Sequence, residues 1–151
     1  MIETRELFTL TLDVPSIKDL GATPWGHRRI AQVTGGRFEG ERLKGTVHAG
    51  PGGDWMLLRQ DGVLALDVRI TLETDDGHLI FMSYRGMRHG PKEVIERLNR
   101  GEKVDPQSYY FRMVPQFETS SDKYAWLNRL VALGKGRREP TGPIYSVYEV
   151  L

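Results

Sequence analysis

The stretch LALDVRITLETDDGHLIFMSYRG, residues 64–86, contains two strand-like halves on either side of a turn. Apolar side chains fill one set of alternate positions before the turn: Leu64, Leu66, Val68, Ile70 and Leu72. Polar side chains fill most of the intervening positions: Asp67, Arg69, Thr71 and Glu73. A period of two residues is typical of a β-strand with two chemically different faces.

The turn fixes how the two halves pair. A three-residue connection, Asp75-Asp76-Gly77, with glycine in the left-handed conformation, is a common hairpin with a bulge. It predicts apolar pairs on one face: Leu72 with Ile80, Ile70 with Met82, and Val68 with Tyr84. The other face then pairs Arg69 with Ser83 and Asp67 with Arg85. A two-residue turn would place Arg85 against Val68, so side-chain pairing favours the longer connection.

The rest of the chain predicts further antiparallel strands and a single helix. Alternating or glycine-punctuated segments occur at residues 7–14, 28–50, 55–68, 109–119, 124–136 and 144–151. Residues 91–99 predict the helix, because Pro91 suits its first turn and Gly101 follows as a stop signal. We therefore expect one all-β domain over residues 1–151, an antiparallel β-barrel with the helix covering or flanking one end.

Composition narrows the possible functions. The chain has 151 residues, a formal net charge of +1 and no cysteine. A net charge so close to zero argues against nucleic-acid binding, and the missing thiols exclude disulfides and cysteine nucleophiles. No signal peptide or membrane-spanning run is visible, so we expect a cytoplasmic protein without a membrane partner.

The motifs of common cofactor sites are also missing from the sequence. The histidines at positions 27, 48, 78 and 89 are scattered, so no metal site is expected. The glycine-rich pieces lack the strand–loop–helix setting of a nucleotide loop, and no serine nucleophile elbow occurs. We expect no cofactor.

A family resemblance covers residues 7–150. It is carried by GATPWGHRRI (21–30), TGGRFEGERLKGTV (34–47), GGDW (52–55), LDVRITLETDDGHLI (66–80), YRGMRHGP (84–91), YYFR (109–112), FET (117–119) and YAWLN (124–128). In these stretches the chain resembles the domain-of-unknown-function family 3237, also called uncharacterised protein family 0311. The resemblance implies an antiparallel barrel similar to the lipocalin-like barrels, around an interior cavity. It implies no particular reaction.

The central question is whether the polar strand face meets water or a pocket. Half-solvated strands are the commonest antiparallel arrangement, which favours water. Arginine in place of lysine, together with the polar signature that the resemblance implies, favours a pocket or its rim. The candidate catalytic residues are Asp54, Asp67, His89 and Tyr110. The candidate substrate-binding residues are Trp55, Arg69, Arg85, Arg112, Glu118, Trp126 and Asn128.

Each candidate also has a structural interpretation. His89 could be a general acid or base, or a residue that flanks the helix. Asp54 beside Trp55 could be a carboxylate with a raised pKa, or a turn cap beside a core tryptophan. Asp67 and Arg85 could be a base with its anion-binding partner, or a structural ion pair.

Acids, bases and guanidinium groups without cofactor motifs indicate a cofactor-independent enzyme. We expect proton-transfer chemistry, such as isomerisation, hydration, elimination or cyclisation, on a small anionic or carbonyl-bearing molecule. Asp54 or Asp67 would be the base, His89 or Tyr110 the acid, and Arg85 with Arg112 would stabilise negative charge. The alternatives are a barrel that binds a small molecule without catalysis and a structural module without a pocket. The terminal segment IYSVYEVL (144–151) allows a homodimer, although an internal position in the sheet fits it better.

Overall fold

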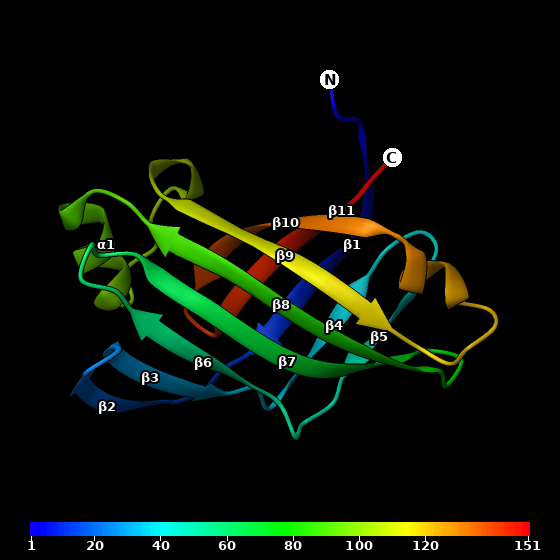
Figure 1. Ribbon diagram of the computed structural model, residues 1–151, viewed down its shortest axis with the longest axis horizontal. Helices are drawn as coiled ribbons and strands as arrows, with labels where there is room; N and C mark the ends of the chain where they lie inside the picture. The colour runs from blue at the N-terminus through cyan, green and yellow to red at the C-terminus, as the bar shows by residue number, and fades with distance from the viewer.

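The computed structural model describes all 151 residues as one strongly curved antiparallel sheet with a short helix at one end (Figure 1). The eleven strands are β1 (Thr4–Asp13), β2 (Ile17–Thr23), β3 (Gly26–Gln32), β4 (Gly35–Glu39), β5 (Lys44–Val47), β6 (Gly53–Leu58), β7 (Leu64–Thr74), β8 (Leu79–His89), β9 (Tyr110–Glu118), β10 (Val131–Glu139) and β11 (Gly142–Val150). The predicted all-β barrel is confirmed.

Eight of these strands close the barrel. They follow the order β7-β5-β4-β1-β11-β10-β9-β8, and β8 pairs with β7 to complete the ring. Strand β7 is shared between two neighbours on its other side. Its second half pairs with β5, and its first half pairs with β6. The remaining strands, β6, β3 and β2, therefore extend from the ring as a three-stranded wing.

The hairpin of β7 and β8 has the predicted register. Leu72 lies opposite Ile80, Ile70 opposite Met82 and Asp67 opposite Arg85. Gly77 has φ of 89°, the left-handed conformation that the three-residue connection requires. The apolar row of β7 is buried inside the barrel, so the polar row points outward. The pocket interpretation of that row is wrong, because closing the sheet turns the apolar row toward the interior.

The helix is confirmed, and one predicted strand start is corrected. Helix α1 spans Lys92–Asn99 after Pro91 and lies at the end of the barrel where β8 finishes (Figure 1). Residues 124–130, expected in a strand, instead contain the 3₁₀ helix η2 (Ala125–Arg129), and β10 begins only at Val131. Another 3₁₀ turn, η1, covers Pro106–Ser108. Strand β11 pairs with β1 and with β10, so the terminal segment is internal.

Large side chains fill the end of the barrel away from α1. Phe8 packs against Phe38 and Phe117, with ring centroids 5.4 and 5.9 Å apart. At Gly86, an added Cβ would lie 2.3 Å from the backbone oxygen of Arg112, so the absence of a side chain lets β8 and β9 approach. None of the helices is long and apolar enough to cross a membrane.

Candidate active site

A cavity of about 380 Å³ opens between the wing and the ring, at the end of the barrel that carries α1. This volume lies within the range of about 300–1,000 Å³ that is usual for small-molecule sites. Most of its wall is apolar, including Leu12, Met56, Leu64, Leu66 and Val68. Its polar side chains are Asp19, Arg29, Asp54, Tyr84, Arg88, Asn99, Arg138 and Tyr145. A cavity of this kind is not expected of a structural module without a pocket.

Asp54 is the carboxylate of the inner wall. It lies on β6 between Ala31 of β3 and Val68 of β7. Its Oδ1 accepts a hydrogen bond from the backbone N–H of Asp67 at 3.0 Å, and Oδ2 accepts none from the protein. Burial raises the pKa of Asp54 to about 6, and the neighbouring Asp67 charge adds to the effect. A carboxyl group with this pKa can exchange a proton near neutral pH.

Two tyrosines stand beside Asp54. Tyr84 lies on the inner face of β8, opposite Val68, and Tyr145 comes from β11 on the far side of the ring. Their rings meet edge to face at 5.2 Å between centroids. The Tyr84 hydroxyl is buried and has no hydrogen-bond partner within 3.5 Å, although it interacts electrostatically with the Tyr145 hydroxyl. Burial raises the pKa of both hydroxyls, so both remain proton donors at neutral pH.

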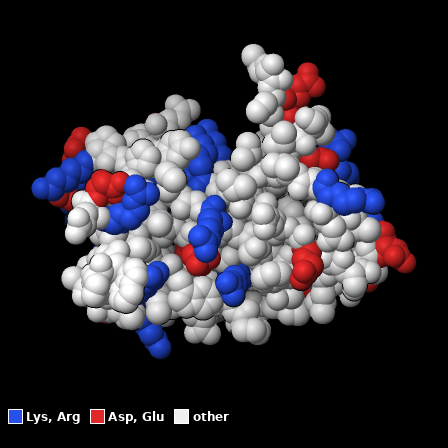
Figure 2. Space-filling model, viewed as in Figure 1, with Lys and Arg blue, Asp and Glu red and all other residues white.

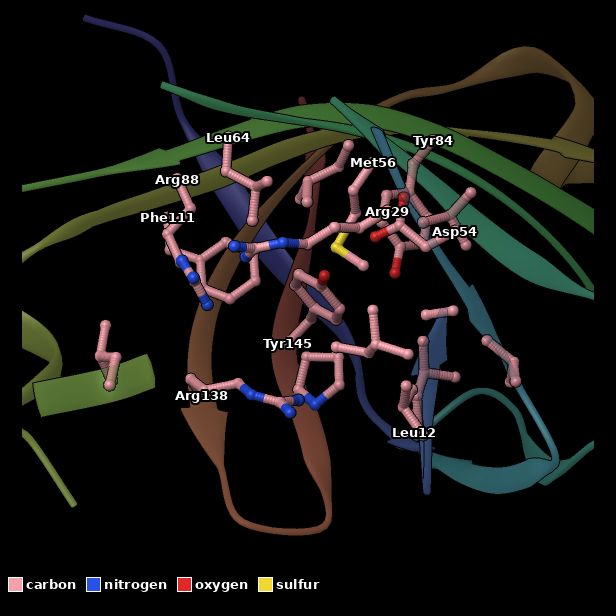
Figure 3. A pocket seen from close by; sticks show the side chains of 18 of the residues that line it. Leu12, Arg29, Asp54, Met56, Leu64, Tyr84, Arg88, Phe111, Arg138 and Tyr145 are labelled. Carbon is pink, nitrogen blue, oxygen red and sulfur yellow. The ribbon is translucent and has the colours of Figure 1, made fainter. Parts of the chain in front are cut away.

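Two arginines lie at the α1 end of the cavity, on the opposite side of Tyr145 from Asp54 (Figure 3). Arg88 continues the inner row of β8, where it pairs with Leu64 and Phe111. Arg138 lies near the end of β10, next to Pro143 of β11. Neither forms an ion pair, and the Arg88 Nε is buried without a partner. Burial lowers the pKa of each guanidinium, and the Arg138 charge lowers that of Arg88 further.

Of the residues predicted from the sequence, only Asp54 lines this cavity. The outward row of β7 and β8 carries Asp67, Arg69 and Arg85. Asp67 and Arg85 lie opposite each other but form no ion pair. Figure 2 shows this outer face, on which charged side chains are scattered among uncharged ones.

The other predicted residues also lie away from the cavity, and their contacts are structural. His89 stacks on Tyr110 with ring centroids 4.9 Å apart, and the Arg112 guanidinium lies 5.0 Å from the same Tyr110 ring. Trp55 is 41% exposed on the outward face of β6. Glu118 is exposed at the end of β9. These side chains fall on outward positions of their strands, because the inward positions carry the apolar row.

Residues 124–128 correct a further expectation. Because they form a 3₁₀ helix rather than a strand, Trp126 and Asn128 do not share a face with the other candidates. The Asn128 side chain exchanges two hydrogen bonds of 2.9 Å with the backbone of Thr119, and Arg42 covers the Trp126 ring at 4.4 Å. Both residues support the loop after β9.

Residues 3–150 match the family described as "Protein of unknown function (DUF3237)". The chain belongs to this family. A UPF0311 protein of Rhodopseudomonas palustris is 35% identical over 150 residues, which cover 99% of this chain and 97% of the relative. The crystal structure of a beta-barrel like protein from Acinetobacter baumannii is 41% identical with a TM-score of 0.87, covering 100% of this chain and 97% of the other.

A more distant likeness extends the DUF3237 barrel to a fungal protein. The crystal structure of an enzyme from Penicillium herquei has a TM-score of 0.74 at 20% identity, over 99% of this chain and 95% of that one. At this identity the match shows a shared fold alone.

Sequence reasoning missed most of the polar residues of this DUF3237 cavity. The sequence pattern does predict that Arg88 faces inward, because the inner row of Ile80, Met82 and Tyr84 continues at every second position to Gly86 and Arg88. No local pattern indicates Arg138 or Tyr145, because they face the cavity only once the ring has closed. No three His, Asp or Glu side chains come together in an arrangement that could hold a metal ion.

Proposed function

We propose that the protein is a cofactor-independent enzyme that transfers a proton on a small carbonyl-bearing or anionic molecule. The observation that carries this proposal is Asp54, a cavity-facing carboxyl group with one free oxygen and a pKa of about 6. Ionised Asp54 would take a proton from the carbon next to a carbonyl group. It would return that proton, or deliver it to another atom, in the second half of the reaction.

Tyr84 and Tyr145 have the complementary role. Their hydroxyl groups stay protonated, and that of Tyr84 has no partner in the protein. Directed at a substrate carbonyl oxygen, they would stabilise the negative charge that grows as Asp54 removes the proton. The same arrangement serves isomerisation, hydration, elimination and cyclisation, which all pass through an enolate-like state. The tyrosines thus replace His89 and Tyr110 as the proposed hydrogen donors.

Hydrogen–deuterium exchange tests the proposal without knowledge of the natural substrate. A panel of small β-keto acids, β-diketones and α,β-unsaturated ketones is incubated in D₂O with the protein, and exchange at the acidic carbon is followed by NMR. We expect wild type to accelerate exchange of at least one compound above the buffer rate, and Asp54→Asn to abolish the acceleration. Asp61→Asn, which alters an exposed carboxylate that pairs with Arg59 away from the cavity, is the matched control. Exchange that survives in Asp54→Asn, or no acceleration by wild type, would contradict the proposal.

The second candidate is a barrel that binds a small molecule without catalysis. The unpaired Arg88 and Arg138 favour it, because they could hold an anion without any contribution from Asp54. A ligand that binds tightly and shows no Asp54-dependent exchange would support this candidate.

A further inference from the structure

Three arginines from three different strands face the same cavity: Arg29 of β3, Arg88 of β8 and Arg138 of β10. Burial lowers the pKa of Arg88 most, and the positive charges of Arg138 and, to a smaller extent, Arg29 lower it further, so Arg88 lies within electrostatic range of both. Figure 3 shows the side chain of Arg29 reaching across the cavity from the Asp54 side toward Arg88. Like charges gathered at a partly buried site are unfavourable unless an anion joins them.

The acids of the chain do not supply that anion. Asp19 is the only carboxylate within 4.0 Å of Arg29, at 3.7 Å, and it also contacts His27 at 2.5 Å. Arg88 and Arg138 have no carboxylate partner within 4.0 Å. The neighbouring Arg137 faces outward and pairs with Glu139 at 3.4 Å, so the missing partner is specific to the inward arginine. The two unpaired guanidinium groups are therefore left for a ligand.

The charges indicate an anion with a single negative charge. Arg29 is offset by Asp19, whereas Arg88 and Arg138 are offset only by Asp54 on the far side of Tyr145. With Asp54 ionised, the cavity keeps one net positive charge. A carboxylate balances that charge, and its two oxygens match the planar fork of an arginine.

The wall between the two polar ends is apolar. Met56, Leu64, Leu66 and Phe111 line the cavity, with Leu98 of α1 closing the same end as the arginines. We propose that the cavity binds a small organic carboxylate, held by Arg88 and Arg138 beneath α1 with its carbon skeleton along this apolar wall. That the skeleton presents its reacting carbon to Asp54 rests on the proposed function. The binding of the carboxylate does not.

Calorimetric titration with matched pairs of ligands tests the carboxylate site. The probes are hexanoate and cinnamate, their neutral amides, and phenyl phosphate. The variants are Arg88→Gln and Arg138→Gln, with Arg85→Gln and Arg137→Gln as outward-facing controls on the same strands. Because a hydrogen bond to a charged group is worth more than one to a neutral group, we expect each inward variant to weaken carboxylate binding by about tenfold or more. The controls are expected to bind as wild type does.

Several outcomes would overturn this inference. Two results would show that Arg88 and Arg138 do not recognise the carboxylate group: amides that bind as tightly as the acids, or variants of the outward-facing arginines that weaken binding as much as those of the inward-facing ones. Tighter binding of phenyl phosphate would replace a carboxylate site by a phosphate site. Failure of both carboxylates to bind wild type would remove the site.

Two further measurements keep the result interpretable. Thermal unfolding of each variant without ligand checks that a loss of binding is not a loss of folding. Arg88→Lys keeps the positive charge and is expected to bind more tightly than Arg88→Gln. Carboxylate binding without deuterium exchange would contradict the proposed enzyme activity but support the carboxylate site. Deuterium exchange without any preference for carboxylates would support the enzyme activity but contradict the carboxylate site.

Discussion

The backbone N–H of Asp67 donates a hydrogen bond to the Asp54 carboxylate, while the Asp67 side chain points out of the barrel. The Asp67 backbone thus stabilises the Asp54 carboxylate inside the cavity, while the carboxylate of Asp67 itself lies on the outer face of the barrel. The two carboxylates therefore do not share a site. Asp54 is the buried carboxylate of the cavity, whereas Asp19 is half-exposed, and the pKa of Asp54 can be tested directly.

Asp54→Asn is expected to change how stability depends on pH. Between about pH 4 and 6, the folded protein holds a proton on Asp54 that the unfolded chain releases, because the folded pKa is about 6 and the ordinary value is 3.8. This group therefore makes wild type less stable as pH rises through that window, by up to about 3 kcal/mol at pH 7. Urea unfolding at pH 4 and pH 7 should show Asp54→Asn gaining stability relative to wild type at the higher pH.

The control for this prediction is Asp61→Asn. Arg59 lowers the pKa of the exposed Asp61, so the stability difference between this variant and wild type should change only below about pH 4 and stay nearly constant from pH 4 to pH 7. An unchanged stability difference between Asp54→Asn and wild type from pH 4 to pH 7 would show that Asp54 has an ordinary pKa.

Arg88→Met and Arg85→Met separate a cavity arginine from a surface arginine on the same strand. The substitution at position 88 removes a largely buried charge that has no partner, so unfolding free energy at pH 7 should hold or rise by about 1 kcal/mol. Arg85 is exposed and forms no ion pair with Asp67, so its replacement should change stability by less than about 0.5 kcal/mol. A loss of about 3 kcal/mol in Arg85→Met would indicate a structural ion pair after all.

Tyr84→Phe and Tyr124→Phe form another matched pair, since both rings are 3% exposed. The Tyr84 hydroxyl has no partner, whereas that of Tyr124 donates to Asp76 at 2.9 Å. Removing the first should leave stability unchanged or higher, and removing the second should cost about 1 kcal/mol. In the exchange assay the order should reverse, with Tyr84→Phe slowed and Tyr124→Phe unaffected. Equal effects of the two variants in both assays would contradict the assigned difference.

The exchange rate itself should depend on pH through Asp54. A base acts only when ionised, so the rate should rise through a midpoint near pH 6 and level off above it. The positive charge of Arg88 lowers the pKa of Asp54, so Arg88→Gln should move the midpoint upward. A midpoint that does not move would show that the two side chains are electrostatically independent.

Local patterns in the sequence predict much of this fold. The β7–β8 register follows from the period of two and the turn at Gly77, and α1 follows from Pro91 and Gly101, all within a few residues of chain. The site is different, because it depends on strands distant in sequence. Arg138 and Tyr145 face the same cavity as Asp54 only after the ring closes through β11 and β1. The sequence indicates Asp54 as a candidate because it follows a glycine turn and precedes Trp55, although Trp55 lies on the outward face of β6 rather than beside the carboxylate.

Strand β7 pairs with β6 along its first half and with β5 along its second half, so the two polar ends of the cavity lie on different parts of the sheet. The wing of β6, β3 and β2 carries Asp54, while the closed ring carries Arg88 and Arg138. A change in the length or tilt of the wing would move Asp54 without breaking the closed ring of strands that supports Arg88 and Arg138. In a barrel of this design, the distance between Asp54 and the two arginines can therefore change through the wing while the closed ring stays the same.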